Sequence, residues 1–198
     1  MSILDDVKNH SPEEKRARLV GGATGVLYDI FNFQPWMINI HDMVTSLSKK
    51  CRWNGMLNTP EIYSIAQHSV HVSDYMGSKP YDRLAGLVHD ASEGFMIDMI
   101  TPMKRVFPDF RVVENKMQDS IYNHFGVVMT PERKELLHWA DDHLLHLEAN
   151  EFRRKIYREG TKNKLSDEIK DFRILNCEDA KSLWIDTFNN IMSEILSA

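Results

Sequence analysis

Signals for the start of a helix recur along this sequence and constrain its fold. Ser11-Pro12-Glu13-Glu14 has the order of a capping box, in which a serine and a later glutamate satisfy free N–H groups at a helix start. Thr59-Pro60 and Thr130-Pro131 each place a capping residue before a proline, which is favoured at the first helical position because it lacks an N–H. The sequence therefore predicts an all-α fold.

Apolar periodicity supports a bundle of helices. After Asn176, for example, apolar side chains recur at four-residue spacing through 177–196, which is typical of a helix with one buried face. We expect helices near residues 12–20, 41–50, 60–76, 81–94, 111–125, 131–157 and 177–196.

Two segments do not follow this pattern. Glycines and aromatic residues near 21–40 indicate a short hairpin or an irregular lid. These glycines are not a phosphate-binding loop, because no Gly-Lys-Ser/Thr sequence follows them. Residues 158–175 are charged and aperiodic, so we expect a surface loop there.

Composition limits the size and the partners of the protein. A length of 198 residues with 42% hydrophobic residues suits one domain over 1–198. The net charge of −5 with no basic stripe argues against a nucleic-acid polymer as partner. No apolar run reaches the roughly 18 residues of a membrane span. Asp5 and Asp6 do not fit a signal peptide, and Cys51 and Cys177 form no CxxC pair, so a cytoplasmic protein is expected.

Four residues form a candidate metal site: His68, His89, Asp90 and Asp141. Imidazole nitrogens and carboxylate oxygens together bind divalent ions such as Zn²⁺, Co²⁺ or Mn²⁺ and leave positions open for water and substrate. Each residue lies in a segment expected to be helical, among apolar neighbours at three- and four-residue steps. Taken one at a time, such histidines are more often core residues, and such aspartates are often caps or ion-pair partners.

These residues belong to an ordered series of motifs. The series runs through Thr24-Gly25, Ile40-His41-Asp42-Met43, Ser46-Leu47-Ser48, Arg52-Trp53, Tyr63-Ser64-Ile65-Ala66-Gln67-His68-Ser69, His89-Asp90-Ala91-Ser92-Glu93, Asp98, Pro102-Met103-Lys104 and Ala140-Asp141. With it, the chain resembles the HD-domain phosphohydrolases over roughly residues 24–150. Within that family it is similar to phage dATP triphosphohydrolases and to bacterial 5'-deoxynucleotidases, and the Ala-Gln-His-Ser form is closer to the former.

The resemblance implies a role for each candidate residue. It implies metal ligation by His68, His89, Asp90 and Asp141. Glu93 would take a proton from the attacking water, with Asp98 as acid, base or water-positioning group. Arg52 and Lys104 would bind substrate phosphate, and Trp53 would pack on sugar or base.

The sequence alone also allows purely structural roles for these residues. Glu93 could be a solvated helix residue, and Asp98 could cap the helix that follows it. Arg52 and Lys104 could be surface charges, and Trp53 could be a core tryptophan. His138 stands where family members often carry a lysine, which leaves a phosphate contact there in doubt.

The sequence predicts a metal-dependent deoxynucleotide phosphohydrolase. We expect it to remove triphosphate from dATP as a homo-oligomer in the cytoplasm, for example that of a phage-infected host. A 5'-deoxynucleotidase acting on monophosphates uses the same residues. A non-catalytic nucleotide-binding scaffold is the alternative from another class. Residues 21–40 and Trp53 are the candidates for base selectivity.

Overall fold

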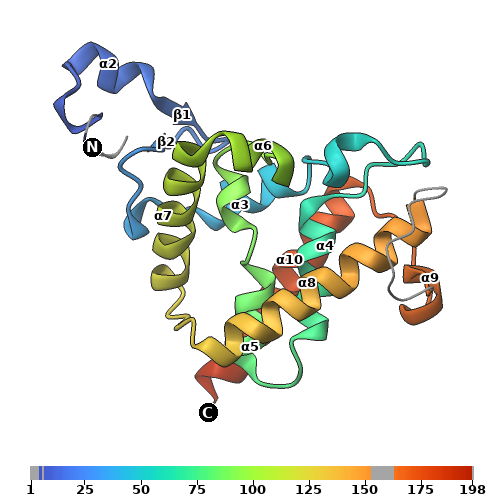
Figure 1. Cartoon of the computed structure of the whole chain (residues 1–198). Coiled ribbons are helices and arrows are strands. Elements are labelled where there is room, and N and C mark those ends of the chain that lie inside the picture. The colour runs from blue at the N-terminus through green and yellow to red at the C-terminus, as the bar shows by residue number, and fades with distance from the viewer. Residues whose placement is uncertain (1–4, 6, 153–162, 198) are drawn as a thin grey trace.

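A computed structural model describes residues 5, 7–152 and 163–197, and helices dominate this part of the chain (Figure 1). The α-helices are α2 (Pro12–Ala17), α3 (Ile40–Leu47), α4 (Ile65–Tyr75), α5 (Pro80–Leu87), α6 (Thr101–Val106), α7 (Pro108–His124), α8 (Pro131–Phe152), α9 (Leu165–Glu168) and α10 (Cys177–Leu196). The short 3₁₀ helices are η1 (Val7–Asn9), η2 (Pro35–Met37), η3 (Arg52–Gly55) and η4 (Ala91–Gly94). The all-α class predicted from the sequence is confirmed.

Helix α4 lies at the centre of the fold and packs against α3, α5, α8 and α10. All its residues from Ile65 to Ser73 are buried, so its polar side chains must find partners inside the protein. Trp184 of α10 is fully buried, stacks on Phe188 and donates its indole N–H to the carbonyl of Leu87 at 3.3 Å. The C-terminal helix thus contacts the end of α5, just before His89 and Asp90.

A small hairpin packs against the start of α3. Strands β1 (Leu19–Gly21) and β2 (Leu27–Asp29) pair antiparallel. Asp42 of α3 accepts hydrogen bonds from the Tyr28 hydroxyl at 2.6 Å and from the backbone N–H and hydroxyl of Thr24 at 2.8 and 2.7 Å. A Cβ on Gly22 would lie 2.1 Å from an Asp42 oxygen, so only glycine fits there. A hairpin was expected near 21–40, and it begins slightly earlier.

Several predicted helix boundaries were wrong. The helix predicted over 12–20 ends at Ala17, because the hairpin takes residues 19–21. The helix predicted from 60 begins at Ile65, with Ser64 as its cap. Before it, backbone hydrogen bonds between 50–52 and 63–65 hold the chain extended, and they override the Thr59-Pro60 signal.

The helix predicted over 81–94 also ends early, at Leu87. His89 and Asp90 lie in a turn, and Glu93 follows in the separate 3₁₀ helix η4. Gln118 of α7 accepts from the N–H of Ser92 at 3.1 Å and donates to the carbonyl of Val88 at 2.7 Å. This side chain satisfies backbone groups that the interrupted helix leaves free.

Other elements agree with the expectation more closely. The capping box at Ser11 forms, and α8 and α10 begin at Pro131 and Cys177 as predicted. Helix α7 begins earlier than the predicted 111, and α6 was not predicted. Residues 153–157 of the predicted helix and 158–162 of the predicted loop lie outside the described residues. The remainder of that loop contains α9, whose Leu165 is fully buried, so it is not wholly a surface segment.

In the described part of the chain, no helix combines the length and the apolar character needed to cross a membrane.

Candidate metal centre

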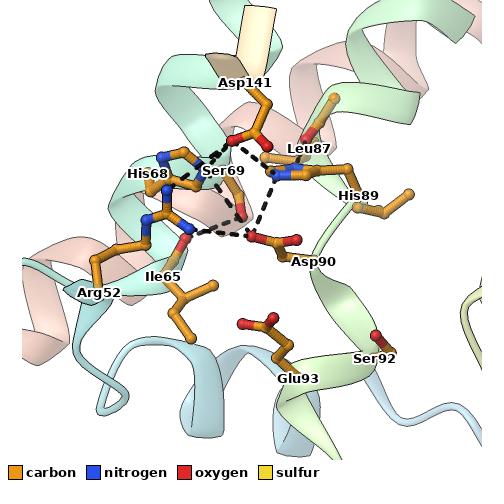
Figure 2. Close-up of polar contacts among 12 residues, drawn as sticks. Arg52, Ile65, His68, Ser69, Leu87, His89, Asp90, Ser92, Glu93 and Asp141 are labelled. Carbon is orange, nitrogen blue, oxygen red and sulfur yellow. Dashed lines mark hydrogen bonds and ion pairs between the residues drawn. The ribbon is translucent and has the colours of Figure 1, made fainter. Parts of the chain in front are cut away.

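The four predicted metal ligands come together at one point of the fold (Figure 2). His68 comes from α4, His89 and Asp90 from the turn after α5, and Asp141 from α8. His68 Nε2 lies 3.2 Å from Asp141 Oδ1 and 3.9 Å from Asp90 Oδ2. His89 Nε2 lies 3.2 Å from Asp90 Oδ2 and 3.9 Å from Asp141 Oδ1. Nitrogen and oxygen atoms thus alternate around a closed ring.

The two separations of 3.2 Å suit neighbouring ligands of one small ion, and the two of 3.9 Å are somewhat longer. A metal bound at about 2.1 Å by nitrogen and oxygen holds neighbouring ligand atoms about 3.0–3.4 Å apart, in octahedral or tetrahedral geometry. The ligand atoms of His68, His89 and Asp141 all lie within 4.8 Å of one another, so these three residues could hold a metal ion. Asp90 adjoins this group through its contacts with both histidines.

The opposite ring nitrogens of both histidines are already engaged. His68 Nδ1 lies 2.6 Å from Glu148 Oε1, and His89 Nδ1 lies 2.8 Å from the carbonyl oxygen of Gly86. Both partners are acceptors, so each Nδ1 carries a proton and donates it. In a neutral imidazole this leaves the Nε2 lone pair facing the carboxylates, which is the arrangement found in metal-binding histidines.

Three atoms at the centre are buried without a hydrogen-bond partner among the described residues. They are Nε2 of His68, Nε2 of His89 and Oδ1 of Asp141. Leaving one buried polar atom unsatisfied costs on the order of 1–3 kcal/mol. A cation coordinated by these atoms would remove that cost, so the residues fit a metal ion.

The histidines and carboxylates of the centre shift one another's pKa values. Burial and the nearby Arg52 lower the pKa of His68, but Glu148 and Asp141 outweigh them and raise it to about 9. A metal ion and the second proton of His68 therefore compete for the same nitrogen. Burial alone would raise the pKa of Asp141, yet the two histidines lower it to about 2. The pKa of Asp90 is likewise lowered, because His89 and Arg52 outweigh its burial.

Asp141 lies at the edge of the centre rather than inside the core. Its side chain is 45% exposed, whereas that of His68 is fully buried. Its Oδ1 is nonetheless buried, where it faces the two histidines.

Glu93 lies beside the centre, but it does not share a helix with His89 as the sequence had predicted. It belongs to η4, is only 5% exposed, and its Oε2 has no hydrogen-bond partner among the described residues. Burial, then Asp90 and Asp98, raise the pKa of Glu93 well above its ordinary value. Lys50 holds this segment by donating to the backbone carbonyls of Glu93 and Met96. The alternative that Glu93 is a solvated helix residue is therefore wrong.

Asp98 lies in the irregular segment between η4 and α6. It is near enough to Glu93 to help raise the pKa of that carboxyl group. Helix α6 begins at Thr101 and has Ile100 at its N-cap position, so the alternative role of Asp98 as a helix cap is wrong.

The two predicted phosphate-binding cations are both close to carboxylates. The Arg52 guanidinium lies 3.3 Å from Glu148, 3.6 Å from Asp90 and 3.9 Å from Asp141. Lys104 Nζ lies 2.6 Å from Glu114 and 3.6 Å from Glu93. Neither is an isolated surface charge, because both side chains are mostly buried.

Trp53 stands next to Arg52 and is partly buried rather than a core tryptophan. Its indole N–H donates to Glu148 Oε2 at 2.9 Å. Its backbone is left-handed, with a φ of 58°, and the next residue, Asn54, has a φ of 53°. Such values are uncommon for residues other than glycine.

Glu148 was not among the residues predicted from the sequence. This residue is fully buried and contacts His68, Arg52 and Trp53. Its sequence signal was its position seven residues after Asp141 on α8, which places both on one helix face. His71, the histidine most easily mistaken for a ligand, instead faces the Tyr63 hydroxyl at 3.0 Å. His138 is exposed on α8.

No family model matches the chain. The uncharacterized protein YfdR of Escherichia coli is 36% identical over an alignment of 107 residues, and the match covers 52% of this chain and 57% of YfdR. The uncharacterized protein RCAP_rcc00048 of Rhodobacter capsulatus is 31% identical over an alignment of 136 residues, and the match covers 65% of this chain and 69% of that protein. The chain belongs to the same family as RCAP_rcc00048. It matches little more than half the length of YfdR.

Proposed function

We propose that this protein is an HD-domain phosphohydrolase that uses a divalent metal ion to cleave the 5' phosphate ester of deoxynucleotides. The favoured reaction releases triphosphate from dATP and leaves deoxyadenosine. The single observation that carries the proposal is the ring of four ligand atoms, in which both histidines direct Nε2 at the two carboxylates. The ordered motifs around these residues in the sequence support the phosphohydrolase family.

When bound, Co²⁺, Mn²⁺ or Zn²⁺ supplies a Lewis acid that polarises the phosphoryl group and makes a water molecule more acidic. Glu93 is the group best placed to accept the proton of the attacking water. Its raised pKa suits a general base, because the carboxylate then holds the accepted proton more firmly. Asp98 maintains this shift through its negative charge.

Arg52 and Lys104 supply positive charge on the side of the centre where phosphate oxygens would bind. A phosphate group must compete with Asp90, Asp141 and Glu148 for Arg52, and with Glu114 for Lys104. Both cations are held in place by these carboxylates before substrate arrives. Less ordering of the side chains is then needed when substrate binds.

A 5'-deoxynucleotidase acting on monophosphates is the second candidate. The observation that favours it is that both cations already face carboxylates, which leaves less positive charge for the β and γ phosphates. A non-catalytic nucleotide-binding scaffold is the third. It gives no reason for a buried Glu93 with an unsatisfied oxygen beside the ligand ring.

Product analysis tests these candidates directly. Metal-stripped protein is incubated with dATP, dAMP, dGTP and ATP, with and without Co²⁺, Mn²⁺ or Zn²⁺, and the products are separated by chromatography. Deoxyadenosine with intact triphosphate supports the favoured reaction, whereas turnover of dAMP alone supports the nucleotidase. Metal binding without any product from these nucleotides would contradict the catalytic proposal. The cytoplasmic location and the homo-oligomer remain proposals, tested by fractionation and by light scattering.

A further inference from the structure

Glu148 connects the candidate metal centre with the candidate substrate-binding residues. Its carboxylate has two oxygens, and the structure gives them separate tasks. Oε1 lies 2.6 Å from Nδ1 of His68, while Oε2 accepts from the Trp53 indole at 2.9 Å and from Arg52 at 3.3 Å. The side chain has no exposed surface. Burying a carboxylate costs free energy unless partners compensate its charge. A fully buried carboxylate that has three such partners therefore indicates a specific role.

We infer that Glu148 is a positioning residue that orients the metal ligand His68 and the substrate-facing pair Arg52 and Trp53 at the same time. This inference rests on the proposed metal-dependent function. It assigns to one side chain the orientation of a metal ligand and the orientation of two candidate substrate-binding residues.

The contact with Glu148 determines the tautomer and the ring orientation of His68. A carboxylate accepting from Nδ1 fixes the proton there, fixes the plane of the ring and makes Nε2 a better electron-pair donor. His68 is fully buried on α4, so water cannot take over the task. His89 differs, because a backbone carbonyl at Gly86 has the corresponding place. Only the His68 arrangement can therefore be altered by changing a side chain.

The contact with Trp53 opposes local strain. Trp53 and Asn54 both have left-handed backbone conformations, which cost non-glycine residues on the order of 1–3 kcal/mol each and persist only where surrounding contacts hold them. The indole hydrogen bond to Glu148 is one such contact. The ion pair of Arg52 with Glu148 is another, since Arg52 and Trp53 are adjacent in η3.

The test uses three variants of α8. Glu148→Gln keeps the size of the side chain and removes its charge. Glu148→Asp keeps the charge but withdraws it by one methylene. Glu135→Gln is the matched control, because it removes an exposed charge on the same helix. Metal-stripped proteins are titrated with Co²⁺, whose visible absorption reports the ligand field, and circular dichroism checks that each variant folds.

We expect Glu148→Gln to weaken Co²⁺ binding by about 10- to 100-fold and to change the visible spectrum, the range seen when outer partners of metal ligands are removed. Glu148→Asp should fall between this variant and the wild type, and Glu135→Gln should stay within about twofold of it. At saturating Co²⁺, Glu148→Gln should also raise KM for the nucleotide that the wild type hydrolyses. Trp53→Phe, which removes the indole N–H together with part of the ring system, should raise KM without weakening Co²⁺ binding.

Wild-type Co²⁺ affinity and spectrum in Glu148→Gln would overturn the inference. If Glu148→Gln does not fold, Glu148→Asp decides by the same criterion. If the wild type hydrolyses no nucleotide, the proposed function fails, and the Co²⁺ titration still decides whether Glu148 positions His68. The two failures are thus distinguishable.

Discussion

Arg52→Gln should destabilise the protein strongly, because Arg52 faces three carboxylates in a mostly buried position. Its guanidinium lies 3.3–3.9 Å from Glu148, Asp90 and Asp141, and its side chain is only 15% exposed. Glu148 has no exposed surface, so water cannot replace the lost cation. Removing one partner of a buried ion pair typically costs about 3–5 kcal/mol.

Thermal and urea unfolding at neutral pH measure this loss. For a chain of this size, 1 kcal/mol lowers Tm by about 2–4 °C, so a decrease of roughly 6–20 °C is expected. Arg83→Gln is the control, because Arg83 pairs with Glu194 near the surface and such pairs contribute about 0–1 kcal/mol. Equal losses from the two variants, or a loss below about 1 kcal/mol for Arg52→Gln, would refute the reasoning.

Three further predictions concern catalysis, pH and the core. Glu93→Gln should lower turnover by about 10²- to 10⁴-fold while Co²⁺ binding persists, measured by product analysis and titration; full turnover would remove Glu93 from the mechanism. Burial would raise the pKa of Asp42, but hydrogen bonds from Tyr28 and Thr24 outweigh it and lower this pKa below the unfolded value of 3.8. The contribution of Asp42 to stability is therefore complete above pH 3.8 and is lost as the pH falls towards the lower pKa of the folded state. Urea unfolding from pH 6 to pH 3 should therefore show a smaller pH dependence for Asp42→Asn, and an unchanged slope would contradict this. Trp184→Ala should cost about 3–5 kcal/mol in the same assay, against about 0.5 kcal/mol or less for the exposed Trp36→Ala; similar losses would show that Trp184 is not a core anchor.

The sequence carried the identity of the candidate ligands because their chemistry is local. Imidazole and carboxylate groups in an ordered series of motifs indicate a metal site whether or not the intervening fold is known. Helices α8 and α10 were equally predictable at their starts, since Pro131 and Asn176 act on the residues that follow them. The hairpin near residue 20 was expected from its glycines, and Gly22 is the one that the contact with Asp42 requires.

Contacts between distant segments decided the remainder. The helix expected to carry Glu93 ends at Leu87 because Gln118, from α7, satisfies backbone groups of the turn that follows. The role of Glu148 depends on partners 80 to 96 residues away in the chain, so its position on the face of α8 that carries Asp141 was not enough to reveal that role. Sequence determined which groups are available to bind a metal, because that is a property of each side chain. Only the tertiary structure decided how those groups are charged, oriented and connected, because burial and long-range contacts arise from packing.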